Sequence, residues 1–221
     1  MKADSVLIVF PTRAEAGGFA ARSGETDLFS YNRKTDILIS GAGMIQTAAG
    51  LTEALNNRKY DFVLAAGIAG TFDAGRPLGN VVNVITETLG DTGVEQNNSF
   101  SSFFQTGIFD GNRFPFENGK LVNKTVVDGV LGKLPKVAGT TVNLLFEDKD
   151  KNRDRALKTG ATVETMEGAA VFYVCLKKGV PFAQIRALSN YAGERDKSKW
   201  EINKALEQLH KVINGFLENI D

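Results

Sequence analysis

The sequence contains little of the two residue types that most often bind metals and support acyl-transfer chemistry. Its 221 residues include one cysteine, Cys175, and one histidine, His210. One cysteine excludes an internal disulfide and a multi-cysteine metal site, and it is typical of a reducing compartment. One histidine excludes a zinc site built on several histidines, and a catalytic triad would have to use His210. His210 lies beside the apolar stripe of a C-terminal helical pattern, so we expect it at the surface. Cys175 has no histidine or evident cation beside it, so we expect it to be a packed core thiol rather than a nucleophile.

Net charge and long apolar runs are also absent. Lysine plus arginine and aspartate plus glutamate both number 26, so the formal net charge is zero. No global field therefore attracts nucleic acid or an anionic membrane. The first apolar run, residues 6–10, is too short for the core of a signal peptide or for a membrane span. We expect a cytoplasmic protein that binds a small molecule, with neither nucleic acid nor a membrane as its partner.

What the sequence does have is a regular alternation of strand and helix patterns. Short apolar runs typical of buried strands cover residues 6–10, 37–40, 62–66, 81–86, 136–143 and 182–189. Helical patterns cover residues 13–21, 44–55, 124–134, 148–158, 167–177 and 196–220. This order predicts an α/β fold with at least a partly parallel sheet. No linker or break in composition divides the chain, so we expect one domain over residues 1–221.

Residues 90–120 interrupt this alternation. They are rich in glycine, asparagine and serine, and we expect irregular structure there. Aromatic residues in such a segment predict a pocket wall or a subunit interface, or else a small hydrophobic cluster beneath a long loop. The phenylalanines concerned are Phe100, Phe103, Phe104, Phe109, Phe114 and Phe116.

Glycines follow two of the predicted strands. Gly41-Ala42-Gly43 begins like a dinucleotide-binding fingerprint, but the third glycine of that pattern is missing, so we expect no nicotinamide cofactor. These glycines and those of Gly67-Ile68-Ala69-Gly70 either let backbone N–H groups approach a small ligand or form tight turns.

Two acids precede the predicted helix at 167–177. Glu164 and Glu167 are three residues apart and would share a face if the chain were helical there. The residues that follow have the composition of a buried helix, so a carboxylate would lie at the mouth of an apolar element. It either complements the helix dipole or binds a polar group.

Four segments of the chain resemble segments of one enzyme superfamily, and they occur in the same order along the chain as in that superfamily. Glu164-Thr165-Met166-Glu167-Gly168-Ala169-Ala170, followed by Arg186-Ala187-Leu188-Ser189-Asn190, is similar to the paired signature of nucleoside phosphorylases and nucleoside hydrolases. Gly41–Met44 and Ala66–Gly70 precede them as in that superfamily. Its members nearest to this pattern are the methylthioadenosine/S-adenosylhomocysteine nucleosidases and the futalosine hydrolases. The resemblance implies a three-layer α/β/α domain with a twisted mixed sheet, a homodimer or larger homo-oligomer, and no metal or organic cofactor.

The resemblance also implies roles for individual residues. Glu167 would accept hydrogen bonds from ribose hydroxyls, and Met166 would pack on the sugar. A carboxylate there also favours the positive charge of an oxocarbenium-like transition state. Glu15 matches the acid that activates water in the nucleosidases. Further substrate-binding candidates are Gly43, Ala69, Gly70, Phe146, Glu164 and Arg195.

Glu15 favours hydrolysis over phosphorolysis. Hydrolysis needs a base that takes a proton from water, whereas a glutamate near the attack site would repel phosphate. Arg13 leaves the alternative open, because it would attract an anion.

Asn190 departs from the adenine-specific members, which have aspartate at this position. An aspartic acid gives a proton to purine N7 and accepts from a 6-amino group. The asparagine NH2 donates only, and a 6-oxopurine offers acceptors at both N7 and O6. Asn190 therefore favours hypoxanthine or guanine over adenine.

The residues around Asn190 resemble the futalosine hydrolases in particular. The matching segments are Ser189–Asp196 with Trp200 and Ile202, Thr162–Glu167 and Thr141–Asn143. Futalosine is an inosine-like nucleoside with a carboxyphenyl ketone at its 5′ end, and its cleavage releases hypoxanthine in menaquinone synthesis. The phenylalanines of 100–116 would hold the phenyl ring, and Arg195 or Arg13 would pair with its carboxylate. Alternatives are a purine nucleosidase or phosphorylase acting on inosine or methylthioadenosine, and a nucleoside-binding protein without catalysis.

Overall fold

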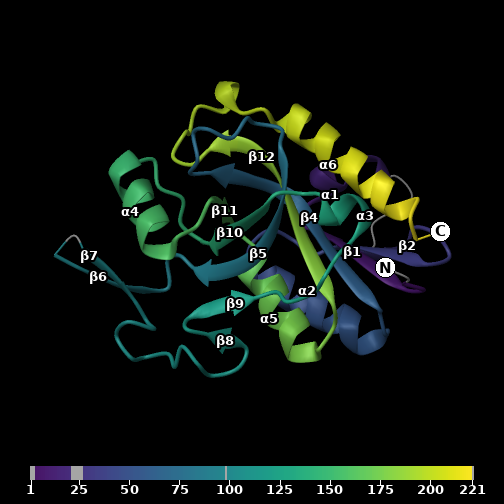
Figure 1. Cartoon of the computed structure of the whole chain (residues 1–221), viewed down its shortest axis with the longest axis horizontal. Helices are drawn as coiled ribbons and strands as arrows, with labels where there is room; N and C mark the ends of the chain where they lie inside the picture. The colour runs from purple at the N-terminus through teal and green to yellow at the C-terminus, as the bar shows by residue number, and fades with distance from the viewer. Residues whose placement is uncertain (1–2, 21–26, 98, 221) are drawn as a thin grey trace.

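The computed structural model describes residues 3–20, 27–97 and 99–220, and it is built around one mixed β-sheet (Figure 1). Hydrogen bonding orders the strands β2-β3-β1-β4-β11-β10-β5-β9-β8, and β12 pairs with both β4 and β5. Their bounds are β1 (Val6–Phe10), β2 (Leu28–Ser30), β3 (Thr35–Ile39), β4 (Phe62–Thr71), β5 (Val81–Leu89), β8 (Phe116–Glu117), β9 (Lys120–Val122), β10 (Lys136–Thr141), β11 (Val163–Thr165) and β12 (Phe182–Tyr191).

Five of these strands close on one another. β4 pairs with β12, β12 with β5, β5 with β10, β10 with β11, and β11 returns to β4. The ring is mixed, because β12 runs parallel to β4 and antiparallel to β5. Closure removes free edges from the middle of the sheet and brings distant strand ends together.

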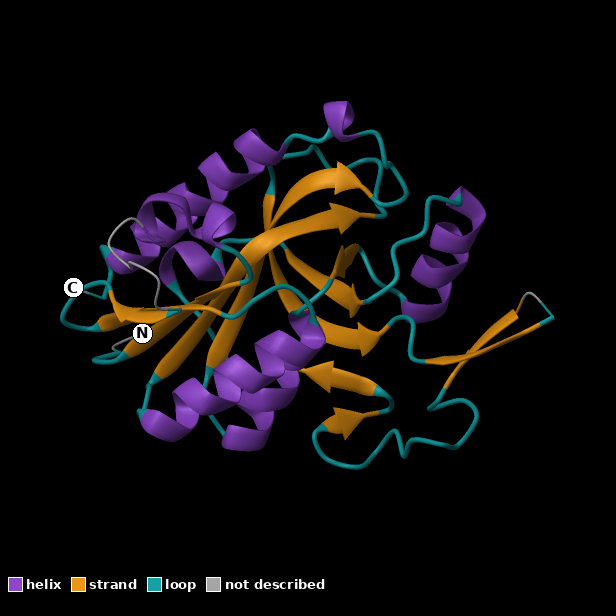
Figure 2. Ribbon diagram, turned by 180° about the vertical axis from the view of Figure 1, so that it is seen from behind, coloured by secondary structure: helices purple, strands orange, loops and turns teal. Residues whose placement is uncertain are grey.

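Helices cover both faces of the sheet, as the view from behind shows (Figure 2). α2 (Met44–Asn57) and α5 (Gly168–Lys178) pack against each other on one face, and α6 (Ile202–Leu217) lies on the other with the short α1 (Arg13–Ala16) and α3 (Gly129–Gly132). The strand β1 shows why both faces are buried, since side chains alternate along it. Val6, Ile8 and Phe10 join the core beneath α6, while Leu7 and Val9 join the core beneath α2 and α5. The α/β class and the mixed sheet are confirmed.

The segment 90–120 is less irregular than expected. It contains the hairpin of β6 (Gly93–Gln96) and β7 (Ser99–Ser102), which projects beside α4 (Lys149–Thr159), and the strands β8 and β9 begin near its end. Its aromatic rings cluster together, with Phe104 lying 5.6 Å from Phe109 and 5.0 Å from Phe116 between ring centroids.

Several expected boundaries were wrong. β4 does not end at residue 66 but continues through the glycines to Thr71, because β11 and β12 pair with its second half. The helix expected over 124–134 is only Gly129–Gly132. The last helix begins at Ile202 rather than at Asp196, whose side chain instead caps the 3₁₀ turn Lys197–Lys199 by accepting from Ser198 N.

Cys175 lies in α5 with no exposed surface, as expected. Burial raises the pKa of its thiol, which excludes it as a ready nucleophile. Within the described residues, no helix combines the length and the apolar character needed to cross a membrane.

Candidate active site

A cavity of about 380 Å³ opens where β1, β4, β11 and β12 end, and it brings together residues from both halves of the chain. Its walls include Glu15, Glu167 and Asn190, the three residues that resemblance marks as catalytic. Of the predicted substrate-binding residues, Ala69, Gly70, Phe146, Glu164, Met166 and Arg195 also line it. Carboxyl ends of strands are where α/β sheets bind ligands.

Glu15 is held at the start of α1. The Thr12 hydroxyl caps the helix by accepting from Glu15 N at 3.2 Å and donates to Glu15 Oε2 at 2.7 Å. The other carboxylate oxygen, Oε1, accepts from the backbone N–H of Ile68 at 3.0 Å. Only 8% of Glu15 is exposed, and burial raises the pKa of its carboxyl, against the opposing effects of the Ile68 and Thr12 hydrogen bonds and of Arg186. A raised pKa moves a carboxylate toward the range of a useful base.

His210 contacts the backbone of Glu15, which corrects the expectation of a surface histidine. It is half-buried on α6, and its ring stacks edge-on against Phe19 at 5.4 Å between centroids. His210 Nε2 donates to the backbone oxygen of Glu15 at 2.7 Å. The amphipathic pattern missed this contact because α1 is the element that approaches that side of α6.

Glu167 stands immediately before α5, while Glu164 lies on the strand β11. The chain is not helical at Glu164, so the condition under which the two acids would share a helical face is not met. Glu167 Oε1 accepts from the backbone N–H of Gly43 at 2.9 Å, which the positive φ of 89° at Gly43 allows. Gly43, a predicted substrate-binding residue, is not among the residues that line the cavity, and its N–H binds the Glu167 carboxylate. Only 6% of Glu167 is exposed.

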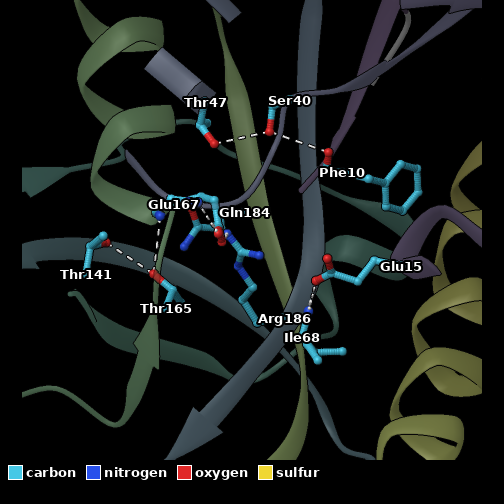
Figure 3. Close-up of polar contacts among 12 residues, drawn as sticks. Phe10, Glu15, Ser40, Thr47, Ile68, Thr141, Thr165, Glu167, Gln184 and Arg186 are labelled. Carbon is cyan, nitrogen blue, oxygen red and sulfur yellow. Dashed lines mark hydrogen bonds and ion pairs between the residues drawn. The ribbon is translucent and has the colours of Figure 1, made fainter. Parts of the chain in front are cut away.

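Arg186 is the residue that sequence reasoning left without a role. It lies on β12, is 1% exposed, and its Nη2 is 3.5 Å from Glu167 Oε2 (Figure 3). Among the described residues, its Nε and Nη1 have no hydrogen-bond partner. A Cβ at Gly67 would lie 2.2 Å from Arg186 Nη1 and 2.9 Å from Glu15 Oε1, so Gly67 makes room for both groups. A charged residue inside the apolar run 182–189 is the sequence signal that could have identified it.

Asn190 is aimed by an irregularity in β12. The register between β4 and β12 shifts between Leu188 and Asn190, and such bulges re-aim side chains. Ser189 Oγ donates to Asn190 Oδ1 at 2.8 Å, and Asn190 Nδ2 donates to the backbone oxygen of Tyr191 at 3.1 Å. The serine holds the amide so that its NH2 edge is distinguished from its oxygen.

Glu164 is engaged in a buried ion pair. Its Oε2 lies 2.6 Å from Arg155 Nη1, and both side chains are at most 6% exposed. The Arg155 guanidinium sits 4.1 Å from the ring centroid of Phe146, another cavity residue. Glu164 and Arg155 therefore hold the wall that contains Phe146.

The two arginines proposed to bind a carboxylate differ in position. Arg195 lines the cavity, is exposed, and lies 5.8 Å from the ring centroid of Trp200, another cavity residue. The neighbouring carboxylates Glu194 and Asp196 pair with Lys199 rather than with Arg195. Arg13 is not among the cavity residues and pairs with Asp27 at 3.4 Å.

The phenylalanines of 100–116 do not line this cavity in the chain described. Phe100 faces a separate hollow of about 190 Å³ beside α4, and Phe103, Phe104, Phe109 and Phe116 form the cluster near β8. Phe114 is exposed, with Lys177 Nζ 5.6 Å from its ring centroid. The expected phenyl-binding wall is therefore not built by these residues of the same chain. Among the described residues, no group of three or more histidine, cysteine, aspartate or glutamate side chains is arranged to hold a metal ion.

Comparison with known proteins agrees with this geometry. A family model described as the phosphorylase superfamily matches residues 14–218. The chain is 32% identical to the futalosine hydrolase of Thermus thermophilus, with 96% of this chain and 94% of the relative covered. It is 28% identical to the 5′-methylthioadenosine/S-adenosylhomocysteine nucleosidase of Marinomonas sp., with 82% and 80% covered.

Solved structures share the fold. The native futalosine hydrolase of Helicobacter pylori superposes with a TM-score of 0.77 at 15% identity, covering 98% of each chain. The methylthioadenosine/S-adenosylhomocysteine nucleosidase of Colwellia psychrerythraea, solved with adenine, gives 0.76 at 18% identity, covering 99% of this chain and 96% of that one. The chain therefore belongs to the phosphorylase superfamily, within the group that contains the futalosine hydrolases.

Proposed function

We propose that this protein hydrolyses the N-glycosidic bond of futalosine and releases hypoxanthine. The observation that carries the proposal is the common cavity of Glu15, Glu167 and Asn190 in a chain 32% identical to futalosine hydrolases over nearly its whole length. The cavity supplies a base, a sugar-binding acid and an amide for the leaving base.

Glu167 binds the sugar in this mechanism. Its Oε1 is fixed by Gly43 and its Oε2 is turned toward Arg186, so the carboxylate is presented to ribose hydroxyls in one orientation. Met166, which also lines the cavity, packs against the sugar ring. The buried carboxylate stabilises positive charge that develops at C1′ as the glycosidic bond lengthens.

Glu15 activates the attacking water. The water oxygen bonds to C1′, its proton passes to the Glu15 carboxylate, and the electrons of the broken C1′–N9 bond leave with the base. The base takes up one proton from the solvent and departs as neutral hypoxanthine, and Glu15 returns its proton to the solvent. Arg186 does not line the cavity, so it acts on the two acids through its charge: it lowers the pKa of Glu15 and lies 3.5 Å from Glu167.

Asn190 selects the base. Its Nδ2 donates to N7 or O6 of a 6-oxopurine, both of which are acceptors, while the Ser189 hydroxyl holds Oδ1. An adenine nucleoside would present its 6-amino donor to the same NH2, which leaves two donors facing each other.

A base-release assay tests the function. Futalosine, inosine and methylthioadenosine are each incubated with the protein, with and without phosphate, and free base is quantified. We expect phosphate-independent release of hypoxanthine from futalosine, with much slower release of adenine from methylthioadenosine. Strict phosphate dependence would identify a phosphorylase, and binding of hypoxanthine without any release would identify a non-catalytic binding protein.

We further propose that the protein is a homodimer. Large apolar side chains are exposed on α2, on α5 and in the loop before β8, among them Ile45 at 85%, Tyr173 at 42% and Phe114 at 63%. Large apolar side chains exposed on packed neighbours such as α2 and α5 are candidates for a subunit interface. Light scattering coupled to size exclusion measures the mass, and Phe114→Asp is expected to shift it toward that of the single chain.

A further inference from the structure

Glu87 is a wholly buried acid that the mechanism above does not use. It lies on β5, has no exposed surface, and is not among the residues that line the cavity. An isolated buried carboxylate is strongly disfavoured, so its partners must compensate for lost hydration. Gln184 Nε2 donates to Glu87 Oε1 at 2.7 Å, Thr141 Oγ1 donates to Oε2 at 2.9 Å, and Thr165 Oγ1 donates to Oε1 at 3.4 Å.

The two threonines connect Glu87 to the start of α5. Ala169 N donates to Thr141 Oγ1 at 2.7 Å, and Gly168 N donates to Thr165 Oγ1 at 3.2 Å. The two hydroxyl oxygens lie 3.1 Å apart, below Glu167 in the close-up (Figure 3). These threonines therefore satisfy the first backbone N–H groups of the helix, which otherwise have no intrahelical acceptor.

A hydroxyl has one proton, and a carboxylate only accepts. Because Glu87 takes the threonine protons, the lone pairs of both hydroxyls are directed to the amides of Gly168 and Ala169. Glu167 makes no side-chain cap for its own helix, so its carboxylate remains directed to Gly43 and Arg186.

The space for Glu87 depends on two glycines. A Cβ at Gly168 would lie 2.0 Å from Glu87 Oε1, and a Cβ at Gly139 would lie 2.6 Å from the same atom. Neither glycine has a positive φ, so close approach to this acid is the reason for their size. The helix begins with a glycine, a poor helix former, at the point where the acid approaches it.

We propose that Glu87 is a positioning residue that fixes the start of α5 and thereby sets the Glu167 carboxylate for recognition of the ribose hydroxyls. The inference rests on the proposed function for the identity of the ligand, but not for the hydrogen-bond chain itself. Sugar recognition is sensitive to displacements of about 0.5 Å, which is the tolerance of a preorganised site. The residue acts through Thr141 and Thr165 and does not touch the substrate.

The test uses two variants that disturb, in different ways, the hydrogen bonds that connect Glu87 through Thr141 and Thr165 to the start of α5. Glu87→Gln keeps the shape of the side chain but turns an NH2 group toward the threonine or glutamine donors. Gly168→Ala keeps Glu87 and its charge, but its methyl group displaces the carboxylate. Asp36→Asn is the matched control, because Asp36 is also a buried acid that accepts from hydroxyls, those of Tyr60 and Ser30. It lies on β3, distant from the start of α5 along the sheet order.

Two readouts separate positioning from general stability. The first is the ratio of kcat/KM for futalosine to kcat/KM for its 2′-deoxy analogue, which reports hydroxyl recognition. We expect this ratio to fall about tenfold or more in Glu87→Gln and Gly168→Ala and to stay unchanged in Asp36→Asn. In a Glu167→Gln background, Glu87→Gln should lower the ratio no further, because both changes act on the same contact.

The second readout is amide hydrogen exchange at Gly168 and Ala169, which needs no activity. We expect exchange at these two amides to accelerate about tenfold in Glu87→Gln and to be unchanged in Asp36→Asn. Unaltered exchange, or an unaltered sugar ratio in both test variants, would overturn the proposal. A wild-type protein that cleaves no nucleoside would defeat the proposed function, while the exchange measurement would still decide the role of Glu87.

Discussion

Arg186 offers the sharpest test of the buried charge arrangement. Its guanidinium is the cation whose charge lowers the pKa of both Glu15 and Glu87, and it lies 3.5 Å from Glu167. Replacing it by methionine keeps much of the volume but leaves these acids without that cation. Removing one partner of a buried ion pair costs roughly 3–5 kcal/mol. The long distance to Glu167 places this site at the lower end, about 3 kcal/mol.

The loss of stability should depend on pH in a defined direction. Without the guanidinium, the folded-state pKa values of Glu15 and Glu87 rise further. At pH 8 a larger fraction of these acids is charged and the variant carries more of the penalty, whereas at pH 5 the folded protein protonates them and avoids part of it. We therefore expect a destabilisation of about 3 kcal/mol at pH 8 and roughly half of that at pH 5, measured by urea unfolding.

Activity should follow the same pKa change. The acid limb of kcat/KM reports the free-enzyme pKa of the base, so it should move to higher pH in Arg186→Met. At pH 7 we expect kcat/KM to fall by about 10²-fold or more, the range associated with a general base. Arg155→Met is the matched control, since it also removes a buried arginine from an acid, here Glu164. An equal loss of stability at both pH values, or an unmoved acid limb, would refute this account of Arg186.

Three further predictions address base choice, acid titration and the support of Glu15. Asn190→Asp should lower kcat/KM for futalosine about 10²-fold or more and increase adenine release from methylthioadenosine, as measured by base release. Burial raises the pKa of Glu87 to about 7 from 4.5, so the folded state holds this proton longer than the unfolded chain. Stability should therefore fall by at most roughly 3 kcal/mol as pH rises from 4.5 to 7, and Glu87→Gln should abolish that slope in unfolding curves. His210→Ala removes the 2.7 Å hydrogen bond to the Glu15 carbonyl, and it should lower the free energy of unfolding by about 1–3 kcal/mol. It should also lower kcat more than it changes KM, and an unchanged kcat would exclude a supporting role for His210.

Much of the fold was accessible from sequence because its signals are local. The run Val6–Phe10 is apolar at every position, and a strand buried on both faces needs that composition. Gly179, in the left-handed region at φ 65°, ends α5 where the helical pattern stops. Cys175 was placed in the core for the same reason, since apolar neighbours at helical spacing surround it.

Elements whose definition is not local were misplaced. The glycines after Ala66 have the composition of a turn, yet β4 continues to Thr71 because partners from two other strands bond to it. The strand β11 is only three residues long, too short to produce a pattern, and its pairing with β10 and β4 defines it.

The candidate site divides in the same way. Glu15, Glu167 and Asn190 were identified from the sequence by itself, because each lies in a segment that resembles a motif of the superfamily. Only the tertiary structure decided that Arg186 would lie between two acids and that His210 would donate to the Glu15 carbonyl. The physical reason is that charge compensation and hydrogen bonding depend on distances of about 3 Å between atoms. Closure of the sheet sets those distances, whereas spacing along the chain does not.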